Sequence, residues 1–175
     1  HRPIRETHVG PAGAFHPAPQ GVSPEALVYT DPAGVALAAV RESKIRVGDR
    51  VAVMGLGAIG QMAAQIARLQ GARWVVVSDP VPVRRELALR HGADIAIDPI
   101  SDDVGTVIKD ATDNAGVDVS LETSGNYAAL NDGLRATGYG GTVVSSAYYA
   151  GDARALSLEG EWHRNRLTLV SIRDQ

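Results

Sequence analysis

Cysteine is absent from the 175-residue sequence. Disulfide frameworks, thiolate zinc sites and a cysteine nucleophile are therefore excluded within it. The sequence also lacks a run of about 18 apolar residues, the length that a helix needs to cross a bilayer. The net charge is only −3, so the charge gives no reason to expect a nucleic acid or an anionic membrane as a partner. We expect a cytoplasmic protein that binds neither.

The sequence begins His1-Arg2-Pro3-Ile4-Arg5, without an initiator methionine or the apolar core of a signal peptide. We therefore expect it to be a piece of a longer protein. At about 100–200 residues per domain, its length allows one domain. Residues 1–23 are rich in proline and glycine and show no sustained periodicity, which predicts an extended connector. The domain itself is predicted over residues 24–175.

From Ser23 onward, helical patterns appear. Ser23 followed by Pro24 is typical of a helix start, and Thr30-Asp31-Pro32 opens a second, alanine-rich helix that ends near Ser43. The clearest helix has Ile59, Met62, Ala63 and Ile66 on one face and ends at Gly71. Further helices are predicted over residues 83–91, 103–114, 127–137 and 156–164.

Six short apolar runs alternate with the later helices, and each is too short to be a helix itself. They cover residues 51–54, 74–77, 95–97, 117–121, 142–144 and 167–172. Their content of β-branched residues is typical of strands that are buried on both faces. The alternation predicts an α/β fold with a Rossmann-type, doubly wound, six-stranded parallel sheet and right-handed crossovers.

A glycine-rich turn, Gly55–Gly60, follows the first strand directly and opens the clearest helix. It fits the pattern G-x-G-x-x-G, which in this context is typical of dinucleotide binding. The first glycine permits the tight turn, the second lets a diphosphate approach the backbone, and the third allows the helix to pack on the strand. A turn without a ligand is the alternative. The predicted cofactor-binding residues are Gly55, Gly57, Ala58, Ile59 and Gly60.

An acidic residue ends the second strand, about 20 residues after the turn, where this fingerprint places the group that binds a ribose 2′-hydroxyl. This residue is Asp79, and a solvated strand-end cap is its alternative role. Arg84 or Arg85 could stack on adenine or attract a 2′-phosphate. The acid repels a 2′-phosphate, and Pro80 supplies no N–H group to one. We therefore predict NAD(H) rather than NADP(H).

Taken together, several blocks resemble the medium-chain dehydrogenase/reductase family, the zinc-type alcohol and polyol dehydrogenases. The likeness runs in order from about Phe15 to Ile172 and is carried by residues 47–51, 55–60, 63–67, 91–94, 116–125 and 140–144. It implies that the turns after the fourth and fifth strands border the nicotinamide half of the cofactor. Roles as turn and packing residues are the alternative. The matching positions are Thr123, Ser124, Gly125, Ser146, Ala147 and Tyr148, where Ala147 replaces a glycine common in the family.

The resemblance also implies a separate catalytic domain that supplies the Cys and His ligands of a catalytic zinc, and these residues do not include it. Residues 1–23 look like its last stretch. Asp31 aligns with a Glu-Pro position near the metal in polyol-type relatives, which makes it a weak candidate ligand. The alternative for Asp31 is a helix N-cap. The spacing of His8 and His16 matches no metal motif, and no catalytic residue is assigned.

The function implied by the resemblance is the NAD(H)-binding domain of a zinc-type oxidoreductase. The complete enzyme would transfer hydride between an alcohol or polyol, or its carbonyl, and the nicotinamide. This chain alone would be inactive. A free-standing NAD(H)-binding module, acting as a sensor or regulatory subunit, is the alternative. A homodimer is expected through the sheet edges, at residues 167–172.

Overall fold

The computed structural model describes residues 7–172. The chain divides into two compact units, with the boundary between Thr30 and Asp31. In the first unit, a 3₁₀ turn (Ala12–Ala14) precedes the short helix α1 (Pro24–Leu27). Ser23 caps α1 as predicted, since its hydroxyl oxygen accepts a hydrogen bond of 3.2 Å from the Ala26 amide. The parts of the predicted connector and domain at residues 1–6 and 173–175 lie outside the described residues.

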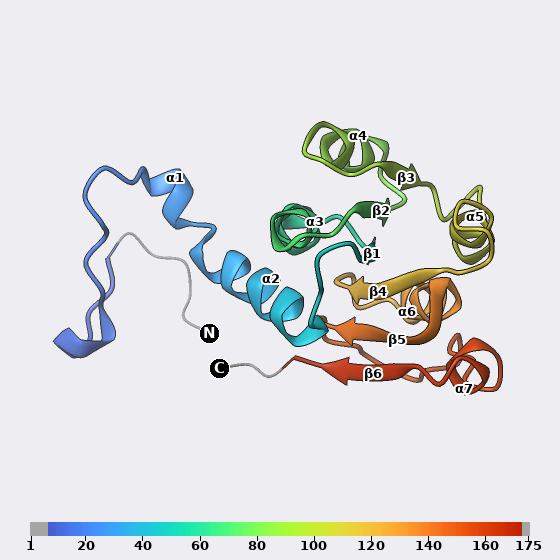
Figure 1. Cartoon of the computed structure of the whole chain (residues 1–175). Coiled ribbons are helices and arrows are strands. Elements are labelled where there is room, and N and C mark those ends of the chain that lie inside the picture. The colour runs from blue at the N-terminus through green and yellow to red at the C-terminus, as the bar shows by residue number, and fades with distance from the viewer. Residues whose placement is uncertain (1–6, 173–175) are drawn as a thin grey trace. The chain divides into compact units, whose positions relative to one another are not determined.

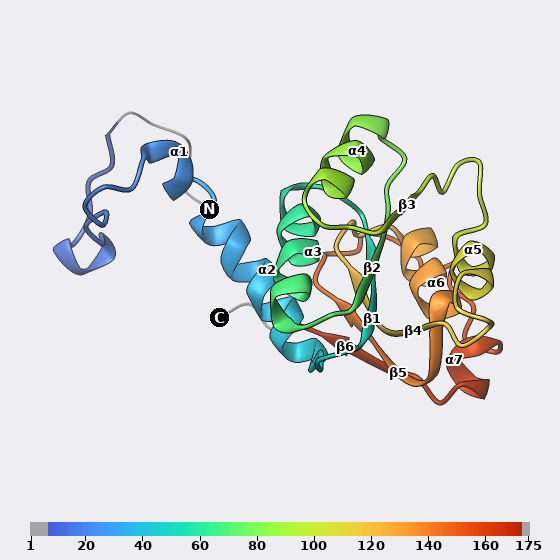
Figure 2. The same cartoon turned by 45° about the horizontal axis from the view of Figure 1, so that its top comes forward.

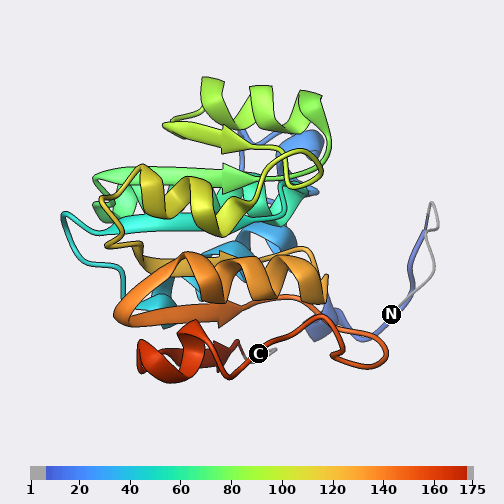
Figure 3. The same cartoon turned by 90° about the vertical axis from the view of Figure 1, so that its right-hand side faces the viewer.

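The second unit is built on one parallel sheet of six strands in the order β3-β2-β1-β4-β5-β6. Figure 3 shows the strand arrows pointing in the same direction. The sheet confirms the predicted Rossmann-type fold, and the order reverses between β1 and β4, where ligands of such sheets bind. The strands are β1 (Arg50–Met54), β2 (Trp74–Ser78), β3 (Ile95–Ile97), β4 (Val117–Glu122), β5 (Thr137–Ser145) and β6 (Thr168–Ser171).

Helices cover both faces of this sheet (Figures 1 and 2). One face carries α2 (Thr30–Ser43), α3 (Ala58–Gln70) and α4 (Pro82–Arg90). The other carries α5 (Val104–Asp110) and α6 (Tyr127–Ala136), and α7 (Glu161–Arg164) packs at the end of the latter layer. None of the helices in the described residues is long and apolar enough to span a membrane.

The alternating strand residues explain why both faces are covered. Val51 and Val53 of β1 pack into the core under α2 and α3, whereas Ala52 and Met54 pack into the core under α5 and α6. All four are at most 1% exposed. Because successive side chains of a strand point to opposite faces, a strand that is apolar throughout requires two covering layers.

Three predicted boundaries are wrong. The helix expected over residues 103–114 already ends at Asp110. The helix expected over residues 156–164 is helical only at Glu161–Arg164, because Gly160 is its N-cap and the chain before it forms turns. Strand β5 begins at Thr137 rather than at residue 142. Its first half is rich in glycine, and a Cβ at Gly138 would lie 2.1 Å from the carbonyl oxygen of Ala115. The strand therefore runs closely past the segment before β4, where only glycine fits.

Candidate functional site

The glycine turn between β1 and α3 has two tightly packed glycines and one open glycine. Gly55 has φ +90°, and a Cβ there would lie 2.7 Å from the Cβ of Ser124. A Cβ at Gly60 would lie 1.9 Å from the carbonyl oxygen of Gly55. A Cβ at Gly57 would meet nothing within 4 Å. The protein itself therefore demands glycine at both ends of the turn, and space is left in front of Gly57.

The N-terminus of α3 meets this open space. Gly57 is the N-cap and offers no side-chain cap, and the first turn contains no acidic residue. Gly57 and Ala58 are exposed, whereas Ile59 is partly buried against the core. The first amides of a helix have no intrahelical partner and carry the positive end of its dipole, which suits a phosphate group. The turn thus combines open space with unpartnered amides, which is the chemistry that an anionic diphosphate needs.

Asp79 follows β2 and lies directly beside the turn. One carboxylate oxygen accepts a hydrogen bond of 2.7 Å from the Leu56 amide, and the other accepts one of 2.8 Å from the Val81 amide. The side chain is only 3% exposed. An ionised carboxylate has about four acceptor positions, and these two amides together with the Arg84 guanidinium at 3.5 Å use three of them. The structure brings Asp79 to the predicted place, and its role toward a ribose remains a prediction.

Arg84, on the first turn of α4, borders the same region. Its guanidinium group lies 3.5 Å from Asp79 and is 49% exposed, so this pair contributes little to stability. The side-chain amide of Gln61 donates a hydrogen bond of 2.8 Å to the Arg84 carbonyl oxygen. This contact ties the start of α3 to the start of α4. One Arg84 nitrogen faces Asp79, and the other N–H groups of this half-exposed side chain can still reach a base or a phosphate.

The turn after β4 packs against the glycine turn. The Thr123 hydroxyl donates to the carbonyl oxygens of Met54 at 3.1 Å and Gly55 at 2.8 Å. Gly125 has φ +74°, and a Cβ there would lie 2.6 Å from the carbonyl oxygen of Tyr148. The predicted residues after β4 and after β5 therefore meet one another and the glycine turn at one edge of the sheet.

Both backbone and side-chain groups hold the loop after β5. Both the amide and the hydroxyl of Ser146 donate to the Glu122 carbonyl oxygen, each at 2.9 Å. Ala147 is partly buried, and its Cβ would lie 3.5 Å from a Cβ at Gly125. Tyr148 is 90% exposed. The hydroxyl of Ser146 thus serves the scaffold, and contacts of these residues with a cofactor remain predictions.

Glu122 is a buried acid whose role the motifs did not reveal. It ends β4 and is 0% exposed. Its carboxylate accepts hydrogen bonds from the amides of Ser124 at 2.8 Å and Gly125 at 3.2 Å, and from the hydroxyls of Ser124 and Tyr149. A signal was present in the sequence, because an acid at the end of an otherwise apolar strand needs partners once it is buried.

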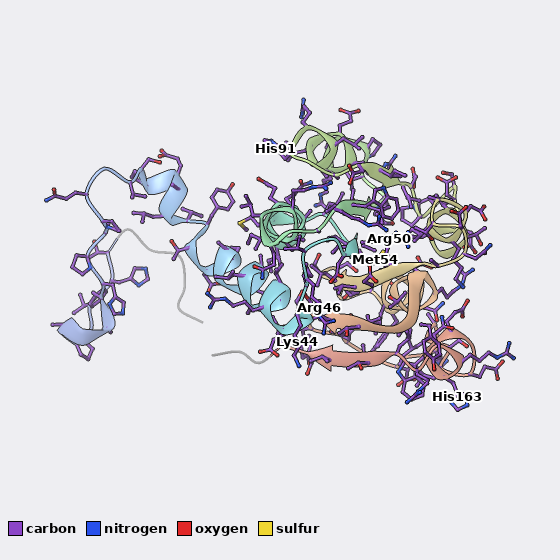
Figure 4. All side chains as sticks on the ribbon, viewed as in Figure 1. Lys44, Arg46, Arg50, Met54, His91 and His163 are labelled. Atoms are coloured by element: carbon purple, nitrogen blue, oxygen red, sulfur yellow. The ribbon has the colours of Figure 1, made fainter. Side chains whose placement is uncertain are left out.

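Metal-ligating side chains do not gather in the described part of the chain. Among residues 7–172, no group of three or more His, Asp or Glu side chains could hold a metal ion. Asp31 is exposed in the first turn of α2, inside the helix rather than at the N-cap. Figure 4 shows His91 at the end of α4 and His163 on α7, far apart on the domain. These residues therefore do not fit a zinc site.

A cavity of about 250 Å³ lies at the opposite, amino edge of the sheet. It is lined by Lys44, Asp49, Asp118 and Tyr139, among others. Both carboxylates there already accept backbone hydrogen bonds of 2.7 Å, from Arg46 and Arg50 respectively. The cavity is thus separate from the predicted binding edge and is formed by groups that stabilise the strand starts.

Three comparisons bear on the site. The sequence profile of the family described as zinc-binding dehydrogenase matches residues 58–173. D-guloside 3-dehydrogenase of Escherichia coli (strain K12) is 45% identical over 155 residues, which are 89% of this chain and 44% of that protein. The crystal structure of 2R,3R-butanediol dehydrogenase from Bacillus subtilis is 31% identical, with a TM-score of 0.79 over 89% of this chain and 44% of that one.

A solved structure with a bound nucleotide is similar as well. A protein from Sinorhizobium meliloti 1021, described as a zinc-binding dehydrogenase bound to NADP, has a TM-score of 0.72 and 30% identity. The match covers 81% of this chain and 42% of that chain. The present chain thus spans less than half the length of each of these three proteins.

Proposed function

Because this chain belongs to the zinc-binding dehydrogenase family, we propose that it is the NAD(H)-binding domain of an oxidoreductase acting on an alcohol or polyol, or on the matching carbonyl compound. The observation that carries the proposal is the open space in front of Gly57 at the uncapped start of α3. Two of the similar proteins are named for a guloside and a butanediol. Both compounds carry hydroxyl groups, which supports this substrate class.

The chain's own part in the reaction is to hold and orient the cofactor. The first amides of α3 bind the diphosphate, and Asp79 accepts hydrogen bonds from the ribose on the β2 side. The turns that contain Ser124 and Ser146, after β4 and β5, would hold the remaining half of the dinucleotide. When bound, the nicotinamide supplies the hydride chemistry.

We favour NAD(H) over NADP(H) as the cofactor. A 2′-phosphate on the adenosine ribose would lie against the Asp79 carboxylate, which is nearly fully buried and therefore weakly screened. The exposed guanidinium of Arg84 could offset part of this repulsion. One similar protein binds NADP, so the preference has to be measured.

We assign the zinc ligands and the residues that bind substrate to segments equivalent to those parts of the longer relatives that this chain does not match. The described residues do not contain a fitting ligand group. Without such segments, we expect the chain to bind the dinucleotide and not to oxidise alcohols.

Parallel calorimetric titrations with NAD, NADP and ADP-ribose test the site and its selectivity together. We expect NAD and ADP-ribose to bind, and NADP to bind at least about tenfold more weakly than NAD, which corresponds to about 1.4 kcal/mol. Tighter binding of NADP than of NAD would contradict the proposed preference for NAD(H). Failure of all three ligands to bind would refute the function. Inductively coupled plasma analysis of the full-length gene product for zinc tests the metal assignment.

A further inference from the structure

Two loops at the carboxyl edge of the sheet converge on one buried carboxylate. One loop follows β4 and contains Ser124 and Gly125, and the other follows β5 and contains Tyr149. Hydrogen bonds from both loops end on the side chain of Glu122, which is 0% exposed. Hydrogen bonds to an ionised acceptor are about twice as strong as neutral ones. The relative position of the two loops is therefore set at this point.

Tyr149 is the residue of the loop after β5 that bonds to Glu122. Its ring lies 4.9 Å from the ring of Tyr127, the first residue of α6, and the Tyr127 hydroxyl donates at 3.1 Å to the Gly151 carbonyl oxygen. Burial, and next the hydrogen bond to Glu122, raise the pKa of Tyr149. The phenol therefore keeps its proton and acts as the donor to the carboxylate.

The segment after Glu122 also contacts the glycine turn. A Cβ at Gly55 would lie 2.7 Å from the Cβ of Ser124, and the Thr123 hydroxyl bonds to the Gly55 carbonyl oxygen. The segment that Glu122 holds is thus packed directly against the turn that faces the diphosphate. Any shift of this segment changes the surface on the β4 and β5 side directly, whereas the Asp79 carboxylate hydrogen-bonds to the Leu56 and Val81 amides and meets the segment only by way of the glycine turn.

We propose that Glu122 and Tyr149 are positioning residues for the half of the dinucleotide that crosses β4 and β5. The inference rests on the proposed function. Neither residue needs to touch the cofactor. Glu122 fixes the turn after β4, and Tyr149 fixes the loop after β5 against it, so that the nicotinamide half finds both surfaces already in place. Pre-ordered loops reduce the entropy that binding would otherwise lose.

The test is a pair of titrations, with NADH and with ADP-ribose, on Tyr149→Phe. This variant keeps the ring and its packing on Tyr127 and removes only the hydroxyl. NADH contains the nicotinamide half and ADP-ribose lacks it. We expect the dissociation constant for NADH to rise about tenfold and that for ADP-ribose to stay at the wild-type value. The matched control is Tyr139→Phe, which makes the same change at a 72% exposed site on the other edge.

Glu122→Gln is the stronger perturbation. In the wild type, one Glu122 oxygen accepts from the amide and hydroxyl of Ser124, and the other accepts from the Gly125 amide and the Tyr149 hydroxyl. In Glu122→Gln, an NH₂ group replaces one of these oxygens and cannot accept from its two donors. The ratio of the NADH dissociation constant to the ADP-ribose dissociation constant should therefore rise further than in Tyr149→Phe. If this variant fails to fold, Tyr149→Phe decides alone. Equal losses for both ligands in Tyr149→Phe, or no loss for either, would overturn the inference. Failure of the wild-type chain to bind NADH and ADP-ribose would overturn the proposed function as well.

Discussion

Two glycine-to-alanine substitutions in one turn should separate stability from binding, because one new methyl group meets the backbone and the other meets open space. At Gly60, the new Cβ would lie 1.9 Å from the Gly55 carbonyl oxygen, about 1.5 Å short of ordinary contact. The obstructing atom belongs to the backbone and cannot rotate away. We therefore expect Gly60→Ala to lower the free energy of unfolding by about 3 kcal/mol, the upper end of overpacking costs. For a chain of this size, the melting temperature should fall by about 6–12 °C.

At Gly57, the same substitution meets open space. The backbone there has φ −66° and ψ −171°, which alanine adopts without strain. Alanine is a poorer N-cap than glycine, but it also reduces the freedom of the unfolded chain, so the two effects partly offset. We expect Gly57→Ala to change the free energy of unfolding by less than about 1 kcal/mol. Because the methyl group occupies the space intended for the diphosphate, NADH affinity should fall at least about tenfold.

Urea denaturation and NADH titration on both variants separate the two effects. Gly57→Ala with wild-type affinity would show that the diphosphate does not lie in front of this residue. Gly60→Ala with wild-type stability would contradict the close packing of the turn. Each glycine thus serves as the control for the other, since the chemical change is identical.

Three further predictions concern carboxylates and the sheet edge. Asp79→Asn places an NH₂ group against the amide of Leu56 or Val81, so it should cost about 1–3 kcal/mol in urea denaturation and weaken NADH binding, whereas the exposed control Asp152→Asn should do neither. Arg135, and next the Thr106 amide, lower the pKa of Asp103 from 3.8 to about 2. Because the folded pKa is depressed, Asp103→Ala should cost about 1 kcal/mol at pH 7 and progressively less as the pH falls from about 4 toward 2. Strand β6 is at the sheet edge, so we propose a homodimer through this edge, and sedimentation showing only monomer at high concentration would contradict it.

The architecture could be predicted from sequence because the strands are buried on both faces. Runs such as Val75–Val77 are apolar without interruption, and no other common element has this pattern at such a short length. The glycine turn could be predicted because its glycines stand at fixed offsets in a known motif, even though the contact at Gly55 is with the distant residue Ser124. The prediction failed at Gly138, because the close contact of its backbone with the segment before β4 leaves no such motif in the sequence.

The candidate site was predicted only in part, for a related reason. Motifs report residues at fixed offsets along the chain, so they located Asp79 about 20 residues after the turn. The connection between Glu122 and Tyr149 spans two loops and depends on how those loops meet. Glu122 was assigned no role from the sequence, because the motifs show neither that its carboxylate is buried nor which donors reach it.

The position of an acid along a strand separates two roles among the carboxylates of this domain. At the amino edge, Asp118 accepts a hydrogen bond from the Arg50 amide and Asp94 accepts one from the Val75 amide, each at 2.7 Å. These acids join neighbouring strands where they begin, so a role in folding alone accounts for them. At the carboxyl edge, Asp79 and Glu122 instead tie loops that face the open glycine turn. Substitutions there should change affinity as well as stability, whereas those at the amino edge should change stability only.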